Sequence, residues 1–148
     1  MKFILACSFL LIATLGYSQK NDKVSWSFDS KKTGSKEYTV TFKGEVKEGW
    51  YIYSQYLESD DGPVRTQLVI ENNSAIRPEG KPEEAGTKVE GYDELFGMNI
   101  IKYKKSITIS QKLVVEEPTT ITGYITFMSC DDSQCLPPVD VPFEIKLK

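Results

Sequence analysis

Histidine is absent from the 148-residue sequence, and cysteine occurs only at Cys7, Cys130 and Cys135. Without histidine the chain lacks the commonest general base and the Ser-His and Cys-His nucleophile pairs. Two cysteines alone also make a poor zinc site. Any redox chemistry must therefore be thiol chemistry or belong to a partner, and we expect neither a metal nor a bound cofactor.

The sequence also has no cluster of basic residues and no long apolar segment after its N-terminal residues. The chain has 18 basic and 21 acidic residues, which gives a formal net charge of −3. No basic patch suits nucleic acid. After the first residues, no apolar stretch approaches the roughly 20 residues that a membrane helix needs. We therefore expect no nucleic-acid partner and no later membrane span.

Residues 1–18 have the three parts of a secretory signal: Lys2, an apolar core over 3–15 and the small-x-small sequence 16–18. An uncleaved anchor is the alternative. Cleavage leaves a single domain, residues 19–148, with 17 basic and 21 acidic residues and a net charge of −4. Export to the periplasm or beyond implies a compartment where disulfides persist.

Two cysteines remain after such cleavage, Cys130 and Cys135, separated by the loop 131–134. A disulfide closing so small a ring would stabilise the fold by only about 2 kcal/mol in the chain-entropy picture. Such a disulfide is better suited to reversible reduction and oxidation than to stabilising the fold. Pro137 and Pro138 lack amide protons and hold the following chain extended, which keeps the Cys135 sulfur near the surface.

The rest of the sequence is organised as strands. Alternating β-branched and aromatic residues are bounded by turn signals, and no segment has an apolar stripe of helical period. About eight short strands favour an all-β, immunoglobulin-like antiparallel β-sandwich. Nothing in the pattern requires more than a monomer. The expected strands lie around residues 24–28 and 38–42, and over 50–56, 66–70, 100–103, 107–115, 121–128 and 141–147.

Residues 72–97 depart from this alternation. The part from 72 to 91 is rich in Pro, Gly and Glu, which indicates a long surface excursion. It ends in the segment 92–97, where Leu95 and Phe96 lie in a loop-like context. They either tuck into the core under their own loop or cover something reactive.

The strands expected before Cys130 and after Cys135 place the pair near the mouth of a hairpin, where facing positions meet the Cα separation of about 5.5 Å that a disulfide prefers. No helix dipole is available to lower a thiol pKa. Asp131 and Asp132 should raise the thiol pKa values instead. The pair is then either a thiol pair that reacts when docked to a partner or a permanently closed bridge, and the residues alone leave both open.

Three segments together resemble a known family. They are 123–138 (GYITFMSCDDSQCLPP), 49–53 (GWYIY) and 93–97 (DELFG). They resemble the cysteine hairpin, an aromatic strand and a cap loop in the N-terminal periplasmic domain of the thiol:disulfide interchange protein DsbD. The similarity spans essentially the whole mature chain, and the cysteine hairpin with its double proline is its most specific part.

The resemblance implies an immunoglobulin-like component of a protein-disulfide reductase. Such a domain relays reducing equivalents to thioredoxin-like periplasmic proteins, with the Cys130–Cys135 disulfide as its redox centre and no other cofactor. Because the sequence ends at Lys148 without membrane or thioredoxin-like domains, we expect a separate membrane electron donor.

By position, the resemblance assigns the attack on a partner disulfide to Cys135 and resolution of the mixed disulfide to Cys130. The cap would shield the pair, with its aromatic moved from the position of Leu95 to Phe96. The loop between the cysteines has four residues, where a longer one also occurs in the family. The remaining expected site residues are Asp93, Glu94 and Gly97 in the cap, and Tyr51 and Tyr53 lining the site.

Two other functions fit the same residues. A non-catalytic protein-binding β-sandwich with a structural hairpin disulfide would use the aromatic strand and the loop 93–97 as a contact surface. A carbohydrate-binding sandwich would stack sugars on Trp50, Tyr51 and Tyr53, although aromatics in alternating strands more often pack in the core.

Overall fold

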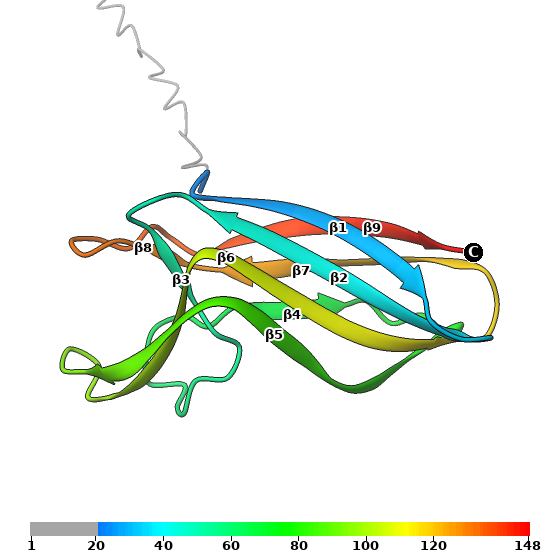
Figure 1. Ribbon diagram of the computed structural model, residues 1–148, viewed down its shortest axis with the longest axis horizontal. Helices are drawn as coiled ribbons and strands as arrows, with labels where there is room; N and C mark the ends of the chain where they lie inside the picture. Colours follow the sequence, from blue (N-terminus) through cyan, green and yellow to red (C-terminus); the bar gives the residue numbers. More distant parts are fainter. Residues whose placement is uncertain (1–20) are drawn as a thin grey trace, which may run out of the picture.

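The computed structural model describes residues 21–148, which form nine β-strands and no helix (Figure 1). The predicted signal segment and Cys7 lie outside these residues. No helix within residues 21–148 is long and apolar enough to cross a membrane. The strands are β1 (Val24–Lys32), β2 (Glu37–Val46), β3 (Tyr51–Tyr53), β4 (Gln67–Ile70), β5 (Ile76–Asp93), β6 (Met98–Val115), β7 (Thr119–Phe127), β8 (Ser129–Cys130) and β9 (Val139–Leu147).

The strands form two antiparallel sheets packed face to face. The larger sheet has the order β1-β2-β6-β3-β8, with β5 on the other edge of β6, and the smaller sheet has the order β4-β7-β9. Residues on β2 and β7 alternate between buried and less buried positions, as strands with one face on a core do. The predicted all-β, immunoglobulin-like antiparallel sandwich is confirmed.

Aromatic rings join the two sheets in the main core. The rings of Phe42 on β2 and Phe143 on β9 lie 4.8 Å apart in an edge-to-face arrangement. Phe28 on β1 contacts both of them at 5.7–5.8 Å. Each fully buried apolar side chain stabilises the fold by roughly 1.5–3 kcal/mol. These contacts therefore hold together the two sheets that position the site.

The expected surface excursion over residues 72–91 is wrong, because most of it is the strand β5. Nearly all of its side chains are exposed, so the strand carries no apolar alternation. It is held by its backbone pairing with β6, interrupted by register shifts between Glu79 and Glu83 and between Gly86 and Thr87. An exposed edge strand tolerates the prolines and charges that suggested a loop, and they also discourage pairing with another chain.

The two strands expected at residues 100–103 and 107–115 are one continuous strand, β6. Its second half pairs with β2 and its first half with β3, while β5 follows its other edge. The strand expected over 121–128 stops at Phe127, and β8 then begins in the other sheet. This change of sheet decides where Cys130 lies.

Gly86 provides a test of the β5–β6 pairing. Its φ is +143°, and a Cβ there would lie 2.2 Å from the Ser106 carbonyl oxygen. We expect Gly86→Ala to lower the free energy of unfolding by more than about 2 kcal/mol, because it combines strain with a backbone clash. Urea denaturation measures the change.

Gly91 is the matched control for this test. It lies on the same strand, and a Cβ there meets nothing within 4 Å. Gly91→Ala should stay within about 0.5 kcal/mol of the wild type. Equal effects of the two substitutions would contradict the close approach at Gly86.

Candidate functional site: a disulfide beside an outer cluster

The short strand β3 is buried on both faces. Ile52 points into the main core, whereas Tyr51 and Tyr53 point to the outside of the large sheet. There they join a second apolar group, which we call the outer cluster. Its buried members are Tyr51, Tyr53, Leu57, Met98, Ile100 and Cys130, with Phe96 and Met128 packed against them. The aromatic strand seen in the sequence therefore packs against a cysteine.

The change of sheet after β7 brings Cys130 to this cluster. β8 pairs with β3 so that Cys130 lies opposite Tyr51. On the other edge of β3, Tyr51 lies opposite Lys104 of β6. Cys130 also forms a β-bridge with Cys135. Since side chains at facing positions share one side of a sheet, a cross-strand row runs from Lys104 through Tyr51 to the two cysteines.

Cys130 and Cys135 form a disulfide with a Cα separation of 4.1 Å. The expected separation of about 5.5 Å was too long. The reason is the type of pairing: the Asp131 N–H donates to the Gln134 carbonyl at 2.9 Å, and the Leu136 N–H to the Ser129 carbonyl at 2.8 Å. These bonds flank the cysteines, which makes them a non-hydrogen-bonded pair, the closer of the two antiparallel arrangements.

The two sulfur-bearing residues differ in access. Cys130 is fully buried in the outer cluster, with 0% of its surface exposed. Cys135 is exposed, as are Pro137 and Pro138 after it. A molecule approaching from solvent therefore meets Cys135 first, and Cys130 is reached only from within the protein.

An open groove of about 460 Å³ lies over the disulfide. It brings together most of the residues predicted from the sequence, although Cys130, Glu94 and Gly97 are not part of its lining. The loop 131–134 and the turn between β5 and β6 project from the same end of the molecule, away from the C-terminus (Figure 1). The groove is lined by Tyr51, Tyr53, Asp93, Leu95, Phe96, Lys102, residues 131–134 and Cys135.

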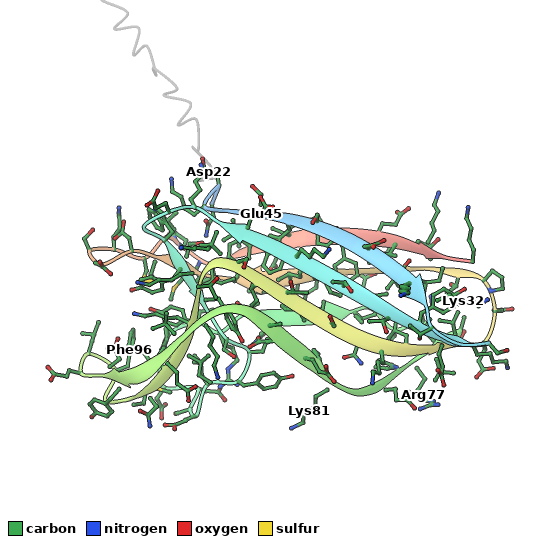
Figure 2. All side chains as sticks on the ribbon, viewed as in Figure 1. Asp22, Lys32, Glu45, Arg77, Lys81 and Phe96 are labelled. Carbon is green, nitrogen blue, oxygen red and sulfur yellow. A yellow bond between two sulfur atoms is a disulfide. The ribbon has the colours of Figure 1, made fainter. Side chains whose placement is uncertain are left out.

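The turn at residues 93–97 is closed by its own first residue. The Asp93 side chain accepts a hydrogen bond from the Leu95 N–H at 3.0 Å, and its carbonyl accepts one from the Gly97 N–H at 2.8 Å. Gly97 has a φ of +64°, which favours glycine. Phe96 lies at the tip of the β5–β6 hairpin, as labelled in Figure 2.

Leu95 and Phe96 differ in what they contact. Leu95 is 85% exposed, so it does not tuck into the core. Phe96 is partly buried and packs against the outer cluster that contains Cys130. Phe96 therefore packs against the cluster to which Cys130 belongs, while Cys135 is exposed to solvent. That the cap shields the cysteines stays a prediction.

Charges of both signs surround the groove. Burial raises the pKa of Tyr51, and the carboxylates of Asp132, Asp93 and Asp131 raise it further, so its hydroxyl stays protonated and donates to the Asp131 carbonyl at 3.1 Å. The Lys102 ammonium lies 4.3 Å from the centre of the Tyr51 ring, within the range of a cation–π contact. Burial also raises the pKa of Tyr53.

Lys102 lines the groove, although it was not among the site residues predicted from the sequence. Its signal is the alternation along β6, in which Met98, Ile100 and Lys102 share the outer face while Tyr103 faces the main core. Its positive charge opposes the effect of Asp131 and Asp132 on a thiol. That those aspartates raise the thiol pKa values stays a prediction.

Among the described residues, no group of three or more His, Cys, Asp or Glu side chains is placed to hold a metal ion. The groove presents the exposed Cys135 and a protonated tyrosine, and the buried Cys130 is joined to Cys135 by the disulfide. These features define a class of protein: an immunoglobulin-like domain with a disulfide at its surface.

The sequence matches the family described as thiol:disulfide interchange protein DsbD, N-terminal, over residues 19–146. The chain belongs to this family, and Cys130 and Cys135 form its disulfide. The comparison with curated proteins found no match.

Three solved structures are similar to this chain. The reduced DsbD N-terminal domain of Neisseria meningitidis is 19% identical, with a TM-score of 0.52, over 80% of this chain and 83% of that one. The N-terminal periplasmic domain of ScsB from Proteus mirabilis is 12% identical, with a TM-score of 0.59, over 87% of this chain and 47% of that one. A complex between the DsbD and PilB N-terminal domains of N. meningitidis matches at 19% identity and a TM-score of 0.45, over 79% of this chain and 80% of that one.

The difference in access predicts a difference in thiol labelling. In the Cys130→Ser and Cys135→Ser variants of residues 19–148, which lack Cys7 and so have a single cysteine each, we expect Cys135 to react with iodoacetamide at least about tenfold faster than Cys130, because exposure controls thiol reactivity. Mass spectrometry of timed samples gives both rates. Equal rates would contradict the burial of Cys130 in the reduced protein.

Proposed function

We propose that this protein is a thiol–disulfide interchange module that reduces disulfides of partner proteins through Cys130 and Cys135. The observation that carries the proposal is the arrangement of the two sulfurs, with one exposed in an open groove and the other buried directly behind it. Family membership supports the same chemistry. A bridge serving only as a staple would gain nothing from presenting one sulfur to solvent.

The reaction has two exchange steps. In the reduced protein, the Cys135 thiolate attacks one sulfur of a partner disulfide, forms a mixed disulfide and releases the partner's other sulfur as a thiolate. The Cys130 thiolate then attacks the Cys135 sulfur, closes the Cys130–Cys135 disulfide and releases the partner's second thiolate. The partner gains two electrons, and its thiolates take up the two protons that the cysteines lost.

The buried position of Cys130 suits the second step. Facing Cys135 across a β-bridge, it competes as an intramolecular nucleophile. Phe96 and the outer cluster keep other disulfides and oxidants away from it. The cap thus protects the resolving thiol and leaves the attacking thiol accessible.

The proposed function also specifies where the protein acts and which proteins it exchanges electrons with. The module acts in the periplasm or outside the cell after removal of the signal segment, as a monomer. Its acceptors are thioredoxin-like proteins that carry disulfides. Its donor is a separate membrane protein that supplies a reduced dithiol, and no other cofactor takes part. The ScsB domain of similar fold is described as periplasmic.

Trapping tests the assigned roles. Cys130→Ser should accumulate mixed disulfides through Cys135, because no thiol remains to resolve them, whereas Cys135→Ser should not. Non-reducing gels of protein incubated with an oxidised thioredoxin-like protein measure the adduct. Equal trapping by both variants would overturn the roles. If the wild-type disulfide resists strong reductant in the native fold, the protein is instead a binding module with a structural bridge.

The cap is tested in the Cys135→Ser background. Phe96→Ala should accelerate alkylation of Cys130 by about fivefold or more, because it uncovers the outer cluster and makes local opening easier. Leu95→Ala is the matched control, since Leu95 is 85% exposed, and should change the rate less than about twofold. No acceleration by Phe96→Ala would remove the shielding role.

A further inference from the structure

The loop between the cysteines is organised by the side chain of Asp131. Its Oδ1 atom accepts three hydrogen bonds, from the Ser133 N–H, the Ser133 hydroxyl and the Gln134 N–H, each at 2.8 Å. These bonds lower the pKa of Asp131, and the bond from the Ser133 N–H has the largest effect. The residue is therefore ionised at neutral pH, and its carboxylate links the start of the loop to Ser133 and Gln134.

One backbone hydrogen bond and one from a side chain also hold the base of this loop. The Asp131 N–H donates to the Gln134 carbonyl, and the Tyr51 hydroxyl donates to the Asp131 carbonyl. None of these contacts includes a sulfur atom. The hairpin therefore has its own means of staying folded when the S–S bond is broken.

We propose that Asp131 is a positioning residue that holds the thiols of reduced Cys130 and Cys135 facing each other. The inference deepens the proposed function and rests on it for its biological purpose. Asp131 takes no part in bond making. It acts by restricting the loop to conformers in which the two sulfurs can meet.

Restriction of the loop changes the balance between dithiol and disulfide. Closing the disulfide costs less conformational entropy when the open form already has the closed geometry. The loop hydrogen bonds and the S–S bond therefore favour each other. Loss of the Asp131 acceptor makes the disulfide easier to reduce and slows its closure by Cys130.

Asp132 provides a matched control. It is the next residue, carries the same charge and is exposed. Its side chain accepts no hydrogen bond among residues 21–148, in contrast to Asp131. Asp132→Ala therefore removes a similar charge near the cysteines and leaves the loop contacts in place.

The experiment equilibrates the mature protein, residues 19–148, with mixtures of reduced and oxidised dithiothreitol, followed by acid quenching and thiol alkylation. In the reaction, protein dithiol and oxidised dithiothreitol exchange two electrons and two protons to give protein disulfide and reduced dithiothreitol. We expect Asp131→Ala to lower the equilibrium constant for protein disulfide formation about tenfold, which is about 30 mV for a two-electron couple. Asp132→Ala should stay within about twofold of the wild type.

Asp131→Asn separates hydrogen bonding from charge, because its amide oxygen still accepts from the loop while the charge is gone. It should recover most of the wild-type equilibrium constant. Equal shifts for Asp131→Ala and Asp132→Ala would overturn the proposal, and so would an Asp131→Asn value equal to that of Asp131→Ala. No partner protein is needed, so this result is independent of the trapping experiment.

Discussion

The pairing of β3 between β6 and β8 is the constraint on which the site depends. The strand has only three residues, yet both of its edges are hydrogen-bonded and both of its faces are covered. Ile52 anchors it in the main core, and its two tyrosines build the outer cluster on the opposite face. Because β8 pairs with β3 after the chain leaves the smaller sheet, Cys130 becomes buried beside Tyr51.

Two short loops, each closed by an aspartate, meet at the groove. Asp93 organises the turn that carries Leu95 and Phe96, and Asp131 organises the loop between the cysteines. Both carboxylates accept hydrogen bonds from amides two residues further along, the usual use of this short side chain in turns. The loops are local structures, but their approach to each other depends on the long β5–β6 hairpin reaching past the edge of the sandwich (Figure 1).

Much of the fold could be predicted from alternation, because strands with one face on the core carry apolar residues at every second position. β5 could not, since its exposed edge position puts no such demand on its side chains and its pairing is made by the backbone. Most of the site could be predicted from short-range features, namely the spacing of the cysteines, the segment 93–97 and the aromatics of β3. Lys102 escaped because its role depends on which strand lies opposite it.

By itself, the sequence determined a β-sandwich with one pair of closely spaced cysteines, because strand periodicity and a five-residue separation are local properties. Only the tertiary structure decided that Cys130 is buried while Cys135 is exposed, and that Phe96 and not Leu95 contacts the outer cluster. The physical reason is that access depends on what packs against a residue. At this site the covering groups come from β3, β6 and the β5–β6 turn, which are distant in sequence from the cysteines.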